Sequence, residues 1–192
     1  MVTEIRIYFE GDKSLKPGFR AFFDELFDRA RAKRCKVNLI ATDGTPARDF
    51  GIAVRTHLDA WNILLLDSDG PVGAQRTASF IAAQGLGDAH RDSIFWMAEM
   101  MESWFHADKD ALQRFYRDGF DREAMKPNPN VEQISKKDLE DGLKEATENT
   151  GKGAYHKTKH APSLLEAIRP NRVREAAPNC DRLFKIVLLK LA

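Results

Sequence analysis

The sequence predicts an α/β fold in which a mostly parallel sheet is flanked by helices, and the order of its segments leads to this prediction. Short apolar runs at residues 5–9, 35–41 and 61–66 are typical of strands. Between them, residues 19–30 have apolar positions three and four apart, as in an amphipathic helix, and residues 47–60 also suit a helix. Alternating strands and helices favour parallel strands joined by right-handed crossovers.

Length and composition limit the possible classes of protein. At 192 residues the chain is long enough for one domain with a proper core and a small appendage. Its 30 Lys and Arg nearly balance its 29 Asp and Glu, so any affinity for nucleic acid has to come from a local patch. Two cysteines without a Cys-x-x-Cys pair argue against a disulfide framework and a zinc ribbon. No apolar run approaches the roughly 18 residues of a membrane span and no signal-peptide pattern is present, so we expect a cytoplasmic protein without membrane contact.

The rest of the chain continues this pattern and then changes character. Residues 75–84 are predicted to form a helix, residues 93–98 a fourth strand, and residues 99–108 a helix-prone segment. Beyond them the chain is mostly helical, and its last part is basic. We therefore predict an α/β core over residues 1–108 and a helical C-terminal region over residues 109–192 that packs on the core.

Carboxylates follow three of the predicted strands. Glu10 comes after the first, Asp67 and Asp69 after the third, and Glu102 after the fourth. If the third strand lies beside the first, in a 2-1-3 order, these acids meet at the carboxyl edge of the sheet, where open α/β sheets bind ligands. Residues i and i+2 of an extended chain project the same way, so Asp67 and Asp69 are expected to converge on one cation. Carboxylate oxygens suit Mg²⁺ or Mn²⁺, and we predict a metal site formed by these four acids.

Other acidic motifs fit the sequence less well. An EF-hand loop starting at Asp67 needs an oxygen ligand at its fifth position and a Glu at its twelfth, where this chain has Pro71 and Ala78. A haloacid-dehalogenase phosphatase, which forms an aspartyl-phosphate, also begins with an apolar strand and Asp-x-Asp, and it remains a less favoured alternative. Glu99 lies three residues before Glu102, so on a helix both would face one point; its role is left open.

Basic side chains near the carboxyl end are the candidates for contacts with a phosphate backbone. They are Lys157, Lys159, His160, Arg172 and Arg174. The alternative is a basic surface that pairs with the acidic segment at residues 138–141. No Walker A motif occurs, so any nucleotide hydrolysis would come from a partner.

The acidic motifs resemble those of a known family. Toprim domains, the α/β metal-binding modules of topoisomerases, bacterial primases and OLD nucleases, have Glu-Gly after the first strand and Asp-x-Asp after the third, like Glu10-Gly11 and Asp67-Ser68-Asp69 here. Nearly the whole chain resembles an uncharacterised Toprim-like family of bacterial proteins. The segments that carry this resemblance are residues 8–11, 66–71, 101–108 and 155–161. Members of that family are often encoded beside an AAA-type ATPase of the OLD or SMC-like kind, in settings that look like defence against phage or mobile DNA.

The resemblance implies a Toprim-like fold and metal site, and the residues suggest Mg²⁺-dependent cleavage of phosphodiesters. Glu10, Asp67 and Asp69 would hold one or two ions, Glu102 would complete the site or act as base, and Lys157 would offset charge on the phosphate. Glu10, Glu102 and Lys157 are thus the expected catalytic residues. A non-catalytic subunit that binds a metal or a nucleotide and docks an ATPase is the alternative. Whether the substrate is DNA, RNA or tRNA, and the oligomeric state, stay open.

Overall fold

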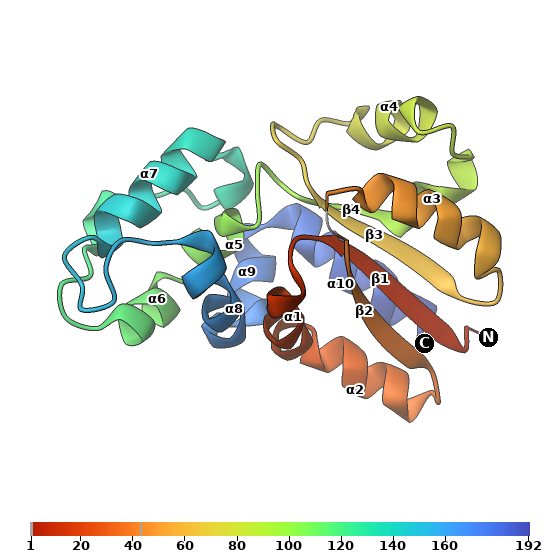
Figure 1. The fold of residues 1–192 in the computed structure, drawn as a ribbon, viewed down its shortest axis with the longest axis horizontal. Helices are drawn as coiled ribbons and strands as arrows, with labels where there is room; N and C mark the ends of the chain where they lie inside the picture. The colour runs from red at the N-terminus through yellow and green to blue at the C-terminus, as the bar shows by residue number, and fades with distance from the viewer. Residues whose placement is uncertain (1, 43) are drawn as a thin grey trace.

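Four parallel strands form one sheet in the order β2-β1-β3-β4. The computed structural model describes residues 2–42 and 44–192 (Figure 1). The strands are β1 (Glu4–Glu10), β2 (Lys36–Thr42), β3 (Trp61–Asp67) and β4 (Ile94–Met97). The 2-1-3 order that the sequence analysis took as a condition is therefore present, and β4 lies beside β3. The carboxyl ends of β1 and β3 are therefore neighbours.

The two central strands are buried on both faces because successive side chains enter different apolar clusters. Along β3, Ile63 and Leu65 join the larger cluster, whereas Leu64 and Leu66 join the smaller one. On the side of the larger cluster the sheet is covered by α1 (Lys16–Phe22), α2 (Asp24–Ala32) and α10 (Pro178–Lys190); α3 (Pro46–Thr56) and α4 (Arg76–Ala83) lie on the other side (Figure 1). The helix predicted over residues 19–30 is thus two helices, which meet at Phe23.

The remaining helices extend the larger cluster past the carboxyl edge of the sheet. They are α5 (Glu102–Ala107), α6 (Lys109–Tyr116), α7 (Lys136–Thr147), α8 (Lys157–Ala167) and α9 (Pro170–Ala176). Short 3₁₀ turns occur at Lys13–Leu15, Asp88–Ser93, Arg122–Ala124 and Val131–Gln133. Helix α8 packs against α1, and α10 returns to β4 and α2. One apolar cluster therefore runs from Ile5 to Leu191, and the division at residue 108 stays a prediction. Within the described ranges, none of the helices has the length and apolarity that a membrane-spanning helix needs.

The segment after β4 differs from the prediction. Glu99 has a positive φ of 59°, and α5 begins only at Glu102. The Glu99 carboxylate accepts a hydrogen bond from the backbone N–H of Lys136 at 3.0 Å, which satisfies a free donor in the first turn of α7. Glu99 and Glu102 therefore do not share a helix face, because the first of them lies outside the helix.

His106 forms a buried link between α5 and α7. Its Nε2 donates to the carbonyl oxygen of Leu139 at 3.0 Å. Burial lowers the pKa of His106 to about 4; the hydrogen bond to Leu139 opposes this shift, and the charge of Lys109 adds to it. In an unfolded chain a histidine has a pKa of about 6.5. Between these two values the unfolded state binds a proton that the folded state does not.

We expect the folded state to lose stability as the pH falls from about 6.5 to about 4, with His106 contributing on the order of 3 kcal/mol to that loss. The substitution His106→Gln keeps a donor for Leu139 and removes the titration, so the variant should lose less stability over this range. Urea unfolding of both proteins at about pH 7 and about pH 4.5 measures the difference. The same pH dependence in both proteins would contradict this account.

Candidate active site

Three acids from three elements lie at the carboxyl edge of β1 and β3. Glu10 is the last residue of β1, Asp67 is the last of β3, and Glu102 is the first of α5. After β4 the chain returns across this edge, and the backbone N–H of Met101 donates to Oδ1 of Asp67 at 2.8 Å. That bond holds the start of α5 at the end of β3. The edge therefore combines acids that are 92 positions apart at most in the sequence.

Glu102 is the most deeply buried of these acids, with 1 % of its surface exposed. Its Oε1 accepts a hydrogen bond from the Tyr155 hydroxyl at 2.8 Å. Its Oε2 has no hydrogen-bond partner in the part of the chain that the structure describes, and Lys157 Nζ lies 3.8 Å from it. The same Nζ lies 3.4 Å from Oδ2 of Asp67. The ammonium group thus stands between the two carboxylates, and this pairing offsets part of the cost of burying them.

The charges at this edge do not balance. Burial raises the pKa of Asp67 to about 6; the Lys157 ammonium opposes that shift, and the carboxylates of Glu102 and Glu10 add to it. Burial acts to lower the pKa of Lys157, but Glu102, Asp67 and Glu10 outweigh burial and raise it. Burial, with the carboxylate of Glu102 second, also raises the pKa of Tyr155. Three carboxylates act on the Lys157 ammonium group, and Lys136 acts on Asp67 while it pairs with Asp69, so among the described residues the site holds an excess of negative charge.

The residues present suit a hard divalent cation in their chemistry. The donors are carboxylate oxygens, the excess charge is negative, and Oε2 of Glu102 is buried without a hydrogen bond. In their present conformation, however, no three acidic, histidine or cysteine side chains of the described ranges lie close enough to enclose an ion. Lys157 lies among the carboxylates instead. The metal site at Glu10, Asp67 and Glu102 therefore stays a prediction.

Asp69, the fourth predicted ligand, pairs with a different lysine. Strand β3 ends at Asp67, and Asp69 has a positive φ of 49°. Its side chain is largely exposed and lies 2.6 Å from Nζ of Lys136. The expectation that Asp67 and Asp69 project the same way assumes an extended chain, and the chain is no longer extended at Asp69. Its part in metal binding stays a prediction.

The five predicted phosphate contacts lie in different surroundings, and Lys157 is the one that pairs with acids of the edge. Lys159 is exposed, whereas the ring of His160 is buried, with Nδ1 3.2 Å from the Tyr116 hydroxyl. Arg174 pairs with Glu25 and Asp181, each at 3.1 Å, and Arg172 pairs with Glu175 at 3.3 Å. Their role in binding nucleic acid stays a prediction.

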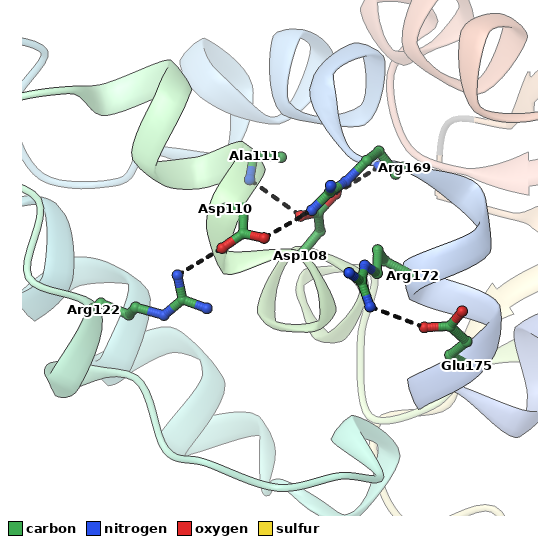
Figure 2. Close-up of polar contacts among 7 residues, drawn as sticks. All are labelled: Asp108, Asp110, Ala111, Arg122, Arg169, Arg172 and Glu175. Carbon is green, nitrogen blue, oxygen red and sulfur yellow. Dashed lines mark hydrogen bonds and ion pairs between the residues drawn. The ribbon is translucent and has the colours of Figure 1, made fainter.

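Sequence reasoning missed two features that support the edge, Tyr155 and an ion-pair network around Asp108 (Figure 2). The buried carboxylate of Asp108 accepts hydrogen bonds from Arg169, at 2.9 Å from the backbone N–H, 2.8 Å from Nε and 2.6 Å from a terminal nitrogen. Burial acts to raise the pKa of Asp108, but the hydrogen bonds from Arg169 outweigh it and lower the pKa. Asp110 joins the network through Arg169 at 3.0 Å and Arg122 at 2.7 Å. The segments 101–108 and 155–161, which carry the family resemblance, were the available signal for Asp108 and Tyr155.

This network connects the far ends of the two helices that carry site residues. Helix α5 begins with Glu102 and ends just before Asp108, whereas α8 begins with Lys157 and ends just before the Ile168-Arg169 segment. Asp108 also accepts a hydrogen bond from the N–H of Ala111 at 3.1 Å and so caps α6. The relative placement of Glu102 and Lys157 is therefore held at both ends of their helices.

The sequence model of a family described as "Domain of unknown function (DUF4276)" matches residues 13–187. The chain belongs to this family. No curated protein matches the chain. Among solved structures, the C-terminal region of the Burkholderia pseudomallei OLD protein is similar, with a TM-score of 0.56 and 12 % identity over 97 % of this chain and 98 % of that one. At this identity the similarity concerns the fold alone, and it confirms the predicted α/β fold. The link of this DUF4276 chain to Toprim activity and to an ATPase stays a prediction.

The Asp108 network gives a test of stability. We expect Asp108→Asn to lower the free energy of unfolding by about 2 kcal/mol, because a buried charge-assisted bond set loses its charge while the side chain keeps its shape. Urea unfolding at neutral pH measures the change. The matched control is Asp28→Asn, whose carboxylate pairs with Arg31 at 2.9 Å on the exposed face of α2 and should matter little. Equal effects of the two substitutions would refute a special role for Asp108.

Proposed function

We propose that this chain is a nuclease-like protein that cleaves phosphodiester bonds with Mg²⁺ or Mn²⁺. The observation that carries the proposal is the convergence of Glu10, Asp67 and Glu102, from three elements, at one partly buried edge beside Lys157. Burying like charges together is unfavourable unless a cation offsets them, so packing alone does not account for the arrangement. The similarity in fold to the C-terminal region of an OLD protein supports the proposal.

Each residue would have a distinct part in the reaction. A divalent ion held by Glu10 and Asp67 would supply an activated water and stabilise charge that develops on the phosphate. Glu102 has one oxygen bonded to Tyr155 and one without a hydrogen bond from any described residue, so it can complete the ligand set or accept a proton from the attacking water. Lys157, already placed between carboxylates, would offset negative charge on the transferred phosphate.

We also propose nucleic acid as the class of substrate and an AAA-type ATPase as a partner in defence against phage or mobile DNA. Only the family resemblance supports the partner and the setting. The substrate has further support from the acids, because divalent ions held by carboxylates are a common means of cleaving phosphodiesters.

Cleavage of plasmid and single-stranded oligonucleotides by the purified chain, with Mg²⁺ or Mn²⁺, tests the reaction. We expect Glu102→Gln to slow cleavage by roughly 100-fold or more, because it removes a proton acceptor at the reacting centre. Asp67→Asn should have a comparable effect, whereas Asp28→Asn, on the distant surface of α2, should leave the rate unchanged. Cleavage that survives Asp67→Asn, or no cleavage by the wild type even with the ATPase present, would reject the nuclease proposal.

Metal binding has a separate test that does not depend on cleavage. We expect Mn²⁺ to raise the melting temperature of the wild type, since a ligand of the native state at 100 times its Kd adds about 2.7 kcal/mol of stability. Asp67→Asn should shift much less, because it removes a ligand charge, and Asp28→Asn should behave like the wild type. A shift in the wild type without cleavage, with the ATPase present, would favour the non-catalytic alternative. No difference between wild type and Asp67→Asn would rule out a metal at this edge.

A further inference from the structure

A second charged site lies at the end of α5 opposite to Glu102. A cavity of about 610 Å³ opens there, within the size range of roughly 300–1,000 Å³ that is usual for ligand sites. Its cations are Lys109, Arg122, Arg169 and Arg172, and its carboxylates are Asp108, Asp110 and Glu123. Most of these side chains form the network in Figure 2. Glu175, which pairs with Arg172, brings the number of carboxylates to four, so binding of an anion here depends on the donors that the cations leave unused.

All four cations have partners, and Arg169 and Lys109 each form more than one hydrogen bond. The guanidinium group of Arg169 donates hydrogen bonds to Asp108 and to Asp110, so its positive charge is shared between these two carboxylates. Lys109 Nζ donates to the carbonyl oxygen of Met125 at 2.6 Å. These bonds fix the wall of the cavity and leave little capacity for a ligand.

Arg122 and Arg172 have unused donors. Arg122 pairs through one nitrogen with Asp110 at 2.7 Å, and Arg172 pairs through one nitrogen with Glu175 at 3.3 Å. A guanidinium has five N–H donors in a planar fork, so most of them remain free in each side chain. The two side chains are 50 % and 51 % exposed and line the same cavity, and in Figure 2 Asp108 and Asp110 lie between them.

We propose that Arg122 and Arg172 bind a backbone phosphate of the nucleic acid that is cleaved at the sheet edge. The inference rests on the proposed nuclease function and adds a second contact with the substrate. A guanidinium group suits phosphate oxygens, which it can bind through two parallel hydrogen bonds. The cavity and Glu102 lie at opposite ends of α5, a helix of six residues whose side chains are mostly buried, so a bound strand would have to pass over the surface around this helix. Such contacts position a strand without reading its sequence.

Binding without cleavage tests the site directly. Fluorescence anisotropy with a labelled single strand of about 20 nucleotides, in EDTA and over a range of salt concentrations, gives affinity and its salt dependence. We expect Arg122→Gln and Arg172→Gln each to weaken binding roughly tenfold. The slope of log K against log [salt] should become shallower by about 0.7 for the phosphate contact that is lost.

The matched control is Arg91→Gln. Arg91 is 48 % exposed and pairs with Asp88 at 3.2 Å, three positions away, as Arg172 pairs with Glu175. It precedes β4 and so lies at the opposite edge of the sheet. Wild-type affinity in Arg91→Gln supports a specific site. Equal weakening in Arg91→Gln and Arg172→Gln would show that overall charge governs binding and would overturn the proposal, as would unchanged affinity in all three variants.

Competition and cleavage distinguish the remaining outcomes. Unlabelled oligonucleotide should displace the label far better than a mononucleotide or inorganic phosphate; a mononucleotide that competes equally well would overturn the backbone site in favour of a nucleotide site. If the arginine variants lose binding while no condition yields cleavage, the phosphate site in the cavity is supported and the nuclease proposal is rejected. If cleavage occurs and Arg122→Gln and Arg172→Gln keep the wild-type KM, the nuclease proposal is supported and the phosphate site in the cavity is rejected.

Discussion

The carboxyl edge of the sheet depends on the pairing of Lys157 with the acids around it. Glu102 is almost completely buried, and a buried carboxylate costs several kcal/mol unless it is paired and hydrogen-bonded. Tyr155 satisfies one of its oxygens and the Lys157 ammonium lies near the other. Without that ammonium, folding would bring Glu102 and Asp67 together as uncompensated like charges. Hydrophobic packing alone does not require this arrangement, and a carboxylate with a raised pKa, like that of Asp67, at the ligand-binding edge of an α/β sheet is typical of functional sites.

The placement of Lys157 follows from how α8 is held along its length. At its start, Tyr155 bonds to Glu102, and after its end, Arg169 bonds to Asp108. Between these two points, α8 packs closely on α1 at Gly18. A Cβ at this position would lie 2.6 Å from both the carbonyl oxygen of Pro162 and Cβ of Leu165. The glycine is needed there for close approach of the two helices. The helical part of the chain thus positions a site that the sheet alone would leave incomplete.

Periodicity was enough to predict the strands and their parallel direction, because apolar alternation depends on nearby residues and crossovers have a fixed hand; the 2-1-3 order was an added condition that the structure bears out. It also placed Glu10 and Asp67 correctly at the ends of neighbouring strands. It failed where the chain leaves regular structure: Asp69 and Glu99 both have positive φ values, which a pattern of residue types does not reveal. The Asp108–Arg169 pair joins positions 61 apart, so only the tertiary fold could show it.

With 12 % identity, the similarity to an OLD protein transfers a fold and no residue roles, so the case for function depends on the charges of this chain. The pKa values of Asp67 and Lys157 are both raised, the first with burial as its main cause and the second against burial. Neighbouring carboxylates contribute to both shifts, which is the behaviour of a net negative cluster. The Lys157 ammonium group carries one positive charge against three carboxylates. Unlike a metal ion, it cannot be coordinated by several carboxylate oxygens. A divalent cation carries a larger charge than the Lys157 ammonium group and prefers carboxylate oxygens as ligands. It would therefore suit the acids of this edge better than Lys157 does.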